Sequence, residues 1–415
     1  MVDQAVDQRP GRRSLGVIGV SSAVAALVTW SLHVVAGRTL GVSGYAHFMV
    51  VWGLFFTLTG VLQGLQQEVT RSVASSRRRD VRGDRTIVGA LVVGVTGAVL
   101  LLATSPLWSG RLLGDGSMPV VGVMAVGVAA YALANQVNGG IAGRGSWRVY
   151  AWAMLLEGLL RAAFMLVVLL VGTNATGWAL ALVGGALAWA LLSLTSDTRR
   201  AALAHGDEPT RVFLPKAAQA MLAAGCSALV VSGFPVLLDI FSRKDLGAEA
   251  GVVLAVLVAT RAPILLFLNA YQGVLITRLV GSTAPGQMLW RWVGRGLLLA
   301  VPAAVLAYVV GPTLLQVIFG TDFVASGRLF AGLVASTCAL AVLTVTGWTT
   351  LALGRHLVFV GGWLLATVVT SVALLLPLGL PDRASLALLL GPVAGAALHG
   401  ASLRLGSPHR VSRTP

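Results

Sequence analysis

Three charged side chains lie well inside long apolar stretches of this sequence, where such groups are rare. Arg261 lies in the stretch 250–277, and Glu157 and Arg161 lie four residues apart in the stretch 149–171. A charge within a membrane is costly, so such residues usually face protein or a water-filled cavity and handle substrates, ions or protons. A guanidinium group keeps its charge, and its planar donors match the oxygens of a phosphate. These residues predict anion binding or proton exchange within a membrane, with a local Glu157–Arg161 ion pair as the structural alternative.

Arg261 shares one side of its stretch with Asn269 and Gln272, which follow eight and eleven residues later. On a helix of about 3.6 residues per turn, these spacings bring the side chains to nearly the same face. We interpret the three residues as lining a polar cavity. The alternative is that Arg261 extends its long side chain to the outer surface of the membrane.

Further amides form polar faces on two other stretches. Gln63 and Gln66 share one helical face, and Asn135 and Asn138 share another with Tyr131. An amide that faces lipid leaves donors and acceptors unpaired, so each face should contact protein or water. Hydrogen bonding between helices explains the glutamines as well as a cavity does, and it explains the asparagines better. The predicted cavity residues are Arg261, Arg161, Glu157, Gln63, Gln66, Asn135, Asn138, Asn269, Gln272 and Arg38.

No arrangement typical of an enzyme accompanies these residues. The sequence has no phosphate-binding loop of the pattern GxxxxGK[ST], no HExxH pair and no nucleophile elbow, and its 15 acidic residues are scattered. Cys226 and Cys338 lie in apolar segments and resemble small buried hydrophobic residues more than a disulfide or a metal site. We therefore expect no enzymatic activity, no cofactor and no bound metal.

The composition is that of an integral membrane protein. With 56% hydrophobic residues, 11% charged residues and a mean hydropathy of +0.85, the chain has too little charge to cover the surface of a soluble domain. The formal charge of +15 does not indicate nucleic acid binding, because the arginines stand in short loops between apolar stretches. The lipid bilayer is the expected partner.

The apolar stretches predict twelve membrane-spanning helices and hence an all-α protein, since about 20 apolar residues cross a bilayer. They run near 15–36, 45–67, 86–104, 118–138, 149–171, 177–196, 217–239, 250–277, 296–318, 329–351, 357–379 and 384–403. The longest internal connection, 196–216, is polar and separates six helices from six. The predicted parts are an N-tail at 1–14, an N-lobe at 15–196, a linker at 197–216, a C-lobe at 217–403 and a C-tail at 404–415.

The basic residues favour one side of the membrane. If the N-terminus is cytoplasmic, the inner segments hold 22 of the 30 lysines and arginines and the outer loops hold six. Cytoplasmic loops are enriched in basic residues, so this bias predicts that both tails are cytoplasmic. Within one inner segment, Glu68 precedes Arg71 by three residues, and we expect an ion pair between them.

The two predicted halves resemble each other weakly. The Leu–Gly pair at 40–41 recurs at 246–247, and the Thr–Arg pair at 70–71 recurs at 277–278. A span that ends in amides separates the members of each set. Since both copies begin outside and end inside, they predict a parallel repeat about an axis along the membrane normal, as in some transporters.

Glycine and proline shape the predicted helices. Pairs of glycines four residues apart, such as Gly60 and Gly64, allow helix backbones to approach closely. Pro235, Pro263 and Pro302 fall inside predicted spans and should kink them. We expect the strongest bends in the spans 217–239 and 250–277.

The segment 37–78 resembles the second-helix region of bacterial polysaccharide flippases, which belong to the multidrug/oligosaccharidyl-lipid/polysaccharide exporter superfamily. Those proteins have an arginine and Leu-Gly, a small turn, an aromatic residue, and a helix that ends in Gly-Leu and Thr-Arg. The matching positions here are Arg38, Leu40, Gly41, Tyr45, Gly64, Leu65, Thr70 and Arg71.

This resemblance implies a MATE-like, V-shaped architecture of two six-helix lobes around a cavity that opens to either side in turn. It also implies a cargo, an oligosaccharide joined by pyrophosphate to a polyprenyl lipid, that is moved across the plasma membrane during cell-surface polysaccharide biosynthesis. A polysaccharide polymerase and glycosyltransferases would be partners. An arginine such as Arg261 or Arg161 would then bind pyrophosphate, and amides would bind sugar hydroxyls.

Two other functions stay open. The chain could be a proton- or sodium-coupled antiporter of drugs or metabolites within the same superfamily, for which an acid such as Glu157 would be indispensable. It could also be a membrane scaffold of envelope polysaccharide synthesis that transports nothing. The three hypotheses differ in the role that they give to the intramembrane charges.

Overall fold

The protein is described by a computed structural model that covers residues 12–114, 116–242, 246–262, 264 and 285–405. The described chain is helical apart from short connections and one isolated β-bridge. It divides into two compact units. The first unit lies within Met1–Thr39 and His47–Ala228, and the second within Leu40–Ala46 and Leu229–Pro415. The lobe boundaries expected from the sequence remain a prediction.

The first helix, α1 (Arg12–Arg79), is a hairpin and not one straight rod. A straight helix of 68 residues would measure about 100 Å, far more than the thickness of a bilayer. At Gly41 the backbone leaves the helical region with a φ of 66°, a conformation that glycine adopts without steric cost. The rings of His33 and Trp52 lie 4.3 Å apart, so the two arms run back along each other. The arms match the predicted spans 15–36 and 45–67.

Eight α-helices and one 3-10 helix follow before Val231. They are α2 (Thr86–Thr104), η1 (Ser105–Leu107), α3 (Ser109–Leu113), α4 (Met118–Gly143), α5 (Trp147–Val171), α6 (Ala175–Gly184), α7 (Leu187–Leu192), α8 (Ser196–Ala202) and α9 (Thr210–Val231). The predicted span 177–196 is therefore two helices, because α6 ends at Gly184 and α7 begins three residues later.

The remaining described helices are α10 (Phe234–Phe241), an unlabelled helix at 248–262, α12 (Pro285–Phe319), α13 (Gly327–Ala352), α14 (His356–Ala373) and α15 (Leu380–Leu405). The predicted bend in 217–239 is confirmed: α9 ends at Val231, and α10 begins at Phe234 with Pro235 in its first turn. Pro263 lies outside the described residues. The helix α12 continues through Pro302.

Ten helices of the described residues are long and apolar enough to cross a membrane. The hairpin α1 counts once among them, and the predicted span 250–277 continues beyond the described residues. Many of their outward side chains are apolar; in α12, Leu298 is 78% exposed and Leu299 is 71% exposed. An apolar surface of this extent is stable against lipid and not against water. The chain is a multi-pass membrane protein with an all-α fold.

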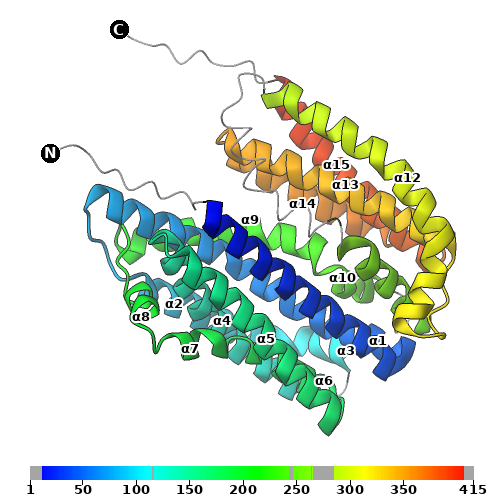
Figure 1. Ribbon diagram of the computed structural model, residues 1–415, viewed down its shortest axis with the longest axis horizontal. Helices are drawn as coiled ribbons and strands as arrows, with labels where there is room; N and C mark the ends of the chain where they lie inside the picture. The colour runs from blue at the N-terminus through cyan, green and yellow to red at the C-terminus, as the bar shows by residue number, and fades with distance from the viewer. Residues whose placement is uncertain (1–11, 115, 243–245, 263, 265–284, 406–415) are drawn as a thin grey trace. The chain divides into compact units, whose positions relative to one another are not determined.

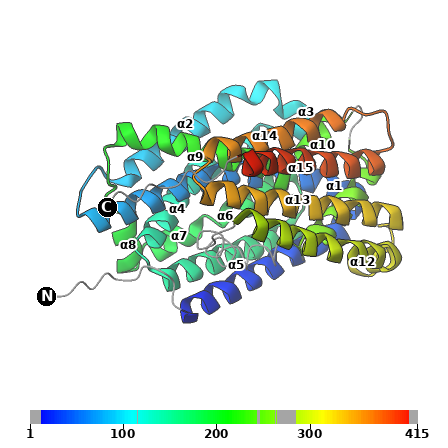
Figure 2. The ribbon, with the colours of Figure 1, turned by 90° about the horizontal axis from the view of Figure 1, so that it is seen from above.

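Each unit has its own packed helices. In the first, α4 contacts α2, α6 and α8, and Val137, Ile141 and Ala201 form a buried cluster where α4 meets α8. In the second, α13, α14 and α15 lie side by side, as Figures 1 and 2 both show. Leu289 of α12 and Trp348 of α13 belong to a buried cluster of that unit. Helix packing thus supplies an apolar core in both units.

The two Leu–Gly pairs of the predicted parallel repeat differ in backbone conformation. Gly41 has a positive φ, whereas Gly247 does not. The second Thr–Arg pair, at 277–278, lies outside the described residues. The internal repeat stays a prediction.

Two connections that are distant in sequence pair at one end of the first unit. The backbone N–H of Gly83 donates to the carbonyl of Gly206 (2.8 Å), and that of Gly206 donates to Asp84 (2.9 Å). The N–H of Thr86 donates to the carbonyl of Ala204 (3.1 Å). These bonds hold the segment after α8 against the segment that joins α1 to α2.

Side chains strengthen this pairing. Arg71 Nη2 lies 2.7 Å from Glu68 Oε1, which confirms the predicted ion pair, and Arg71 Nη1 lies 3.2 Å from Asp207 Oδ2. Burial alone would raise the pKa of Asp207, but hydrogen bonds from Ser72 and Ser75, together with Arg71, hold the pKa below its ordinary value. Asp207 is therefore anchored as a carboxylate on the last turns of α1.

At Gly64 the backbones of α1 and α9 approach so closely that no side chain fits between them. A Cβ atom there would lie 2.3 Å from the carbonyl carbon of Ala220 in α9, and a backbone atom cannot rotate away. We expect Gly64→Ala to lower the free energy of unfolding by about 1–3 kcal/mol. Detergent-induced unfolding of the purified protein measures it. Gly122→Ala on α4 is the control, because a Cβ atom there meets nothing within 4 Å; equal stability of both variants would contradict the prediction.

Candidate functional site

Helices α4 and α5 bring together the three residues of the site that we name the Tyr131 cluster: Tyr131, Glu157 and Arg161. Glu157 and Arg161 lie one turn apart on α5, so their side chains share a face. Arg161 Nη2 donates to Glu157 Oε1 (2.5 Å) and to the Tyr131 hydroxyl (2.9 Å). The Tyr131 hydroxyl also lies 3.2 Å from Glu157 Oε1. The predicted local ion pair is present, and a tyrosine from the neighbouring helix joins it.

Aromatic rings and a glycine enclose the Tyr131 cluster. The guanidinium carbon of Arg161 lies 5.8 Å from the ring centre of Phe55 and 5.2 Å from that of Phe56, distances at which a cation is attracted by the ring face. A Cβ atom at Gly185 would lie 2.8 Å from the Tyr131 hydroxyl. The break between α6 and α7 thus leaves room for the polar groups.

The charges of the Tyr131 cluster are largely removed from solvent. The side chain of Arg161 is 8% exposed and that of Glu157 is 25% exposed. Arg161 Nε is buried and has no hydrogen-bond partner in the described part of the chain. The cluster therefore offers a partly exposed carboxylate and a guanidinium N–H that can bind an additional acceptor.

The two residues of each predicted amide face have different environments in the structure. Gln66 donates from Nε2 to the Tyr150 hydroxyl of α5 (3.0 Å), so it makes the interhelical hydrogen bond that was one of its two interpretations. Gln63 is exposed. Asn135 is buried and donates to the carbonyl of Tyr131 in its own helix (2.8 Å), whereas Asn138 is half-buried.

Arg261 belongs to the second unit and has backbone partners. It is 6% exposed, and its Nη1 donates to the carbonyls of Val230 (3.3 Å) and Val231 (2.7 Å). These carbonyls end α9, where the helix dipole carries partial negative charge. Arg261 Nε is buried without a partner in the residues that the structure covers. Asn269 and Gln272 lie outside those residues, and Arg38 is exposed on α1.

Several buried polar groups have no signal in the sequence. Gln136 donates to Thr86 Oγ1 (2.9 Å) and to the carbonyl of Ala202 (3.2 Å), and His399 Nδ1 lies 3.1 Å from Thr346 Oγ1. Each contact joins segments that are far apart in sequence, so spacing gives no signal for it. Nowhere in the described ranges do three or more His, Cys, Asp or Glu side chains form a group able to hold a metal ion.

Two mycobacterial proteins are similar to this chain over more than nine-tenths of its length. The uncharacterized protein Rv3630 of Mycobacterium tuberculosis is 36% identical over 401 residues, covering 93% of this chain and 91% of its own. The uncharacterized protein Rv1510 of the same species is 37% identical over 401 residues, covering 94% and 92%. No model of a known protein family matches the chain.

Solved structures of transporters have the same fold. A transporter of the MOP superfamily from Pyrococcus furiosus superposes with a TM-score of 0.70 at 14% identity, covering 97% of this chain and 98% of that one. An outward-facing MATE family transporter of the MOP superfamily gives a TM-score of 0.68 at 15% identity over the same fractions. The predicted MATE-like fold class is confirmed. The neighbours are transporters and not enzymes.

Proposed function

The chain belongs to the family of the mycobacterial proteins Rv3630 and Rv1510, and from that membership and its MATE-like fold we propose that it is a membrane transporter. Its proposed cargo is an oligosaccharide linked through pyrophosphate to a polyprenyl lipid. It would move this cargo across the plasma membrane by alternating access, with both termini in the cytoplasm. Cell-surface polysaccharide biosynthesis would use the product, and a polymerase and glycosyltransferases would be partners.

The observation that carries the proposal is a pair of buried arginines. Arg161 of the first unit and Arg261 of the second are the two arginines inside predicted spans, and each keeps a buried Nε–H without a partner in the described residues. A buried donor left unpaired costs about 1–3 kcal/mol. A pyrophosphate offers several acceptor oxygens and negative charge, and it would satisfy such a donor while the cargo is bound. An anionic headgroup therefore suits these groups better than a neutral or cationic drug does.

Glu157 favours a second candidate, a proton-coupled antiporter. Its side chain is a quarter exposed and contacts both Arg161 and Tyr131. Protonation of this carboxylate would weaken its contact with Arg161 and so change the hydrogen bonding of the cluster. In the flippase such a step would free Arg161 for the cargo, whereas in an antiporter it would carry the coupling proton itself.

Transport of a labelled cargo tests the proposal. In proteoliposomes that hold a fluorescent polyprenyl-pyrophosphate oligosaccharide, we expect the protein to equilibrate the lipid between leaflets at least tenfold faster than empty liposomes do. A membrane-impermeant quencher measures the fraction on the outer leaflet.

The alternative functions give different outcomes. No lipid movement, combined with uptake of a cationic dye driven by a pH gradient, would replace the flippase by an antiporter. Absence of both activities, with capture of glycosyltransferases by the purified protein, would favour a scaffold.

A further inference from the structure

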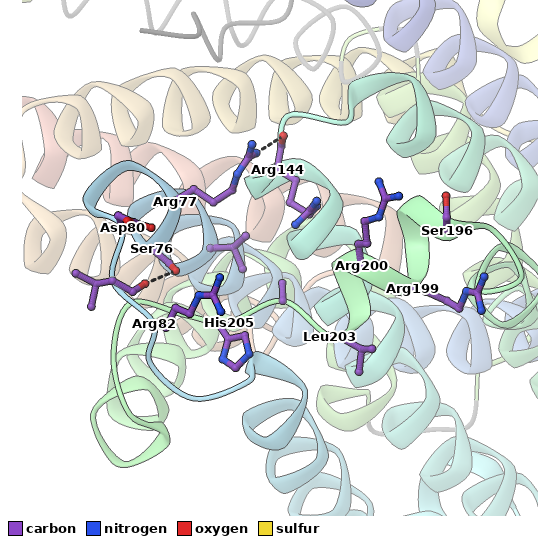
Figure 3. Close-up of a pocket in the computed structure, with 13 residues that line it drawn as sticks. Ser76, Arg77, Asp80, Arg82, Arg144, Ser196, Arg199, Arg200, Leu203 and His205 are labelled. Atoms are coloured by element: carbon purple, nitrogen blue, oxygen red, sulfur yellow. Dashed lines mark hydrogen bonds between the residues drawn. The ribbon is translucent and has the colours of Figure 1, made fainter. Parts of the chain in front are cut away.

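A second set of arginines lies apart from the Tyr131 cluster, at the end of the first unit where α1 and α4 finish. The structure has a cavity of about 810 Å³ there, and all of its lining residues belong to the first unit (Figure 3). The lining residues are Val73, Ser76, Arg77, Asp80, Val81, Arg82, Arg144, Ser196, Arg199, Arg200, Leu203, Ala204 and His205. A volume of several hundred Å³ is typical of a site for a small ligand.

Five chain segments contribute the basic groups of this cavity. Arg77 comes from the last turn of α1, Arg82 from the following connection, Arg144 from the end of α4, and Arg199 and Arg200 from α8. His205 completes the set from the segment after α8. Figure 3 shows these side chains on the lining of the cavity, with Arg82 and Arg199 at opposite sides of the view. The backbone pairing between 83–86 and 204–206 described above fixes two of the segments against each other.

Acidic groups do not balance these arginines. Asp80 is the one acidic residue in the lining, and the ion pair between Arg200 and Asp197 (3.4 Å) has both side chains more than half exposed. Such an exposed pair contributes about 1 kcal/mol or less. For Arg82, Arg144 and Arg199, no ion pair with a carboxylate is found in the described ranges. The cavity therefore carries an excess of positive charge.

Arg144 lies close to other positive charges of the cavity. Arg77 Nη1 donates to the main-chain carbonyl of Arg144 (2.6 Å), which places one guanidinium beside the other residue. Burial and then the charges of Arg77 and Arg200 lower the pKa of Arg144 and outweigh the opposite effect of Asp197, and Arg144 remains a cation at neutral pH. A bound anion would relieve the repulsion among these groups.

We propose that this cavity is a binding site for a phosphate-bearing ligand, separate from the transport site and held by the guanidinium groups of Arg144 and Arg199 with Arg82. Guanidinium and phosphate match in charge and in bidentate geometry. The cavity lies at the ends of membrane-spanning helices, so the headgroup of an anionic lipid can reach it, as can a soluble phosphate compound. Its occupation would tie α1, α4 and α8 together.

Binding to the purified full-length protein in neutral detergent tests this site. The lipid probe is dihexanoyl-phosphatidylglycerol below its micellar concentration, and the soluble probe is inorganic pyrophosphate. Melting temperature against probe concentration gives each dissociation constant. We expect one or both probes to stabilise the protein and Arg144→Gln/Arg199→Gln to bind at least tenfold more weakly. Arg78→Gln/Arg79→Gln is the control, since it removes equal charge beside the cavity without touching its lining.

Every outcome decides the proposal. Stabilisation by the lipid alone assigns a headgroup, and stabilisation by pyrophosphate alone assigns a soluble ligand. Absence of stabilisation, equal weakening in both double variants, or full binding in Arg144→Gln/Arg199→Gln overturns the site. The last result would place pyrophosphate elsewhere, for example at the proposed transport site, so the two proposals fail separately. If the double variant does not fold, Arg82→Gln provides the same test from an exposed loop position.

Discussion

Glu157→Met is expected to lower the free energy of unfolding by roughly 3 kcal/mol, because it leaves the Arg161 guanidinium buried without its counter-charge. Breaking a buried pair typically costs 3–5 kcal/mol. The lower end applies here, since the Glu157 side chain is 25% exposed. Unfolding of the purified protein by a denaturing detergent, followed by circular dichroism, measures the change.

A double variant distinguishes the contribution of the ion pair from the cost of leaving Arg161 as an unpaired buried charge. Glu157→Met/Arg161→Met removes both charges, and we expect its free energy of unfolding to be within about 1 kcal/mol of that of the unchanged protein. The remaining loss reflects the Tyr131 hydroxyl, which would keep the Leu182 carbonyl (3.4 Å) as its partner. Lipid flipping by the double variant should be absent although the protein is stable.

The matched control is the exposed ion pair between Arg328 and Asp382, where the side chains are 80% and 47% exposed. Asp382→Asn should change the free energy of unfolding by less than about 1 kcal/mol. A double variant at 157 and 161 that is no more stable than Glu157→Met would show that the cluster does not act as a coupled pair.

Arg261→Gln is expected to reduce cargo flipping ten- to a hundredfold while the protein accumulates to a normal level. The loss corresponds to one charge-assisted hydrogen bond to the cargo, worth about 1.5–3 kcal/mol. Glutamine keeps an amide donor for the carbonyls of Val230 and Val231, so the end of α9 should stay satisfied. Complementation in cells that lack their own flippase, together with the liposome assay, measures the effect.

A purely structural role of Arg261 predicts another pattern. In that case Arg261→Gln would flip cargo at the rate of the unchanged protein, or would lose activity and protein level together. Arg328→Gln is the control for a general loss of positive charge, because its side chain is 80% exposed. Normal flipping by a stable Arg261→Gln variant would remove this residue from the transport site.

The predicted site was only partly visible in the sequence. The i, i+4 spacing of Glu157 and Arg161 identified their ion pair, because both residues lie on one helix and helical geometry fixes their distance. The sequence predicts that the face of Tyr131 packs against another helix; in the structure the Tyr131 ring lies 5.3 Å from that of Phe55 in α1, and its hydroxyl joins the α5 pair. Spacing along α4 gives the face of Tyr131 but not the helix that this face meets.

The partners of Arg261 and Asp207 likewise could not be predicted from spacing along one helix. Arg261 was expected to face a cavity or the membrane surface, and the structure shows the carbonyls that end α9 as partners of its Nη1. Those carbonyls are available because α9 stops before Pro235, and this stop lies in a different helix from Arg261. Asp207 lies in the predicted linker 197–216, and the structure shows it bound to Arg71 and Ser72 of α1.

The sequence alone determined that this chain crosses a membrane many times, that it is all-α, and which residues place charge within it. These properties follow from the length of apolar stretches and from spacing within one helix, so they depend on local sequence only. Tertiary structure decided the hairpin at Gly41, the partner of each buried polar group, and the gathering of arginines from α1, α4 and α8 around one cavity. Such contacts join segments that are far apart in sequence, as between Arg71 and Asp207, which are 136 residues apart, and they arise from the packing of whole helices, which no local pattern encodes.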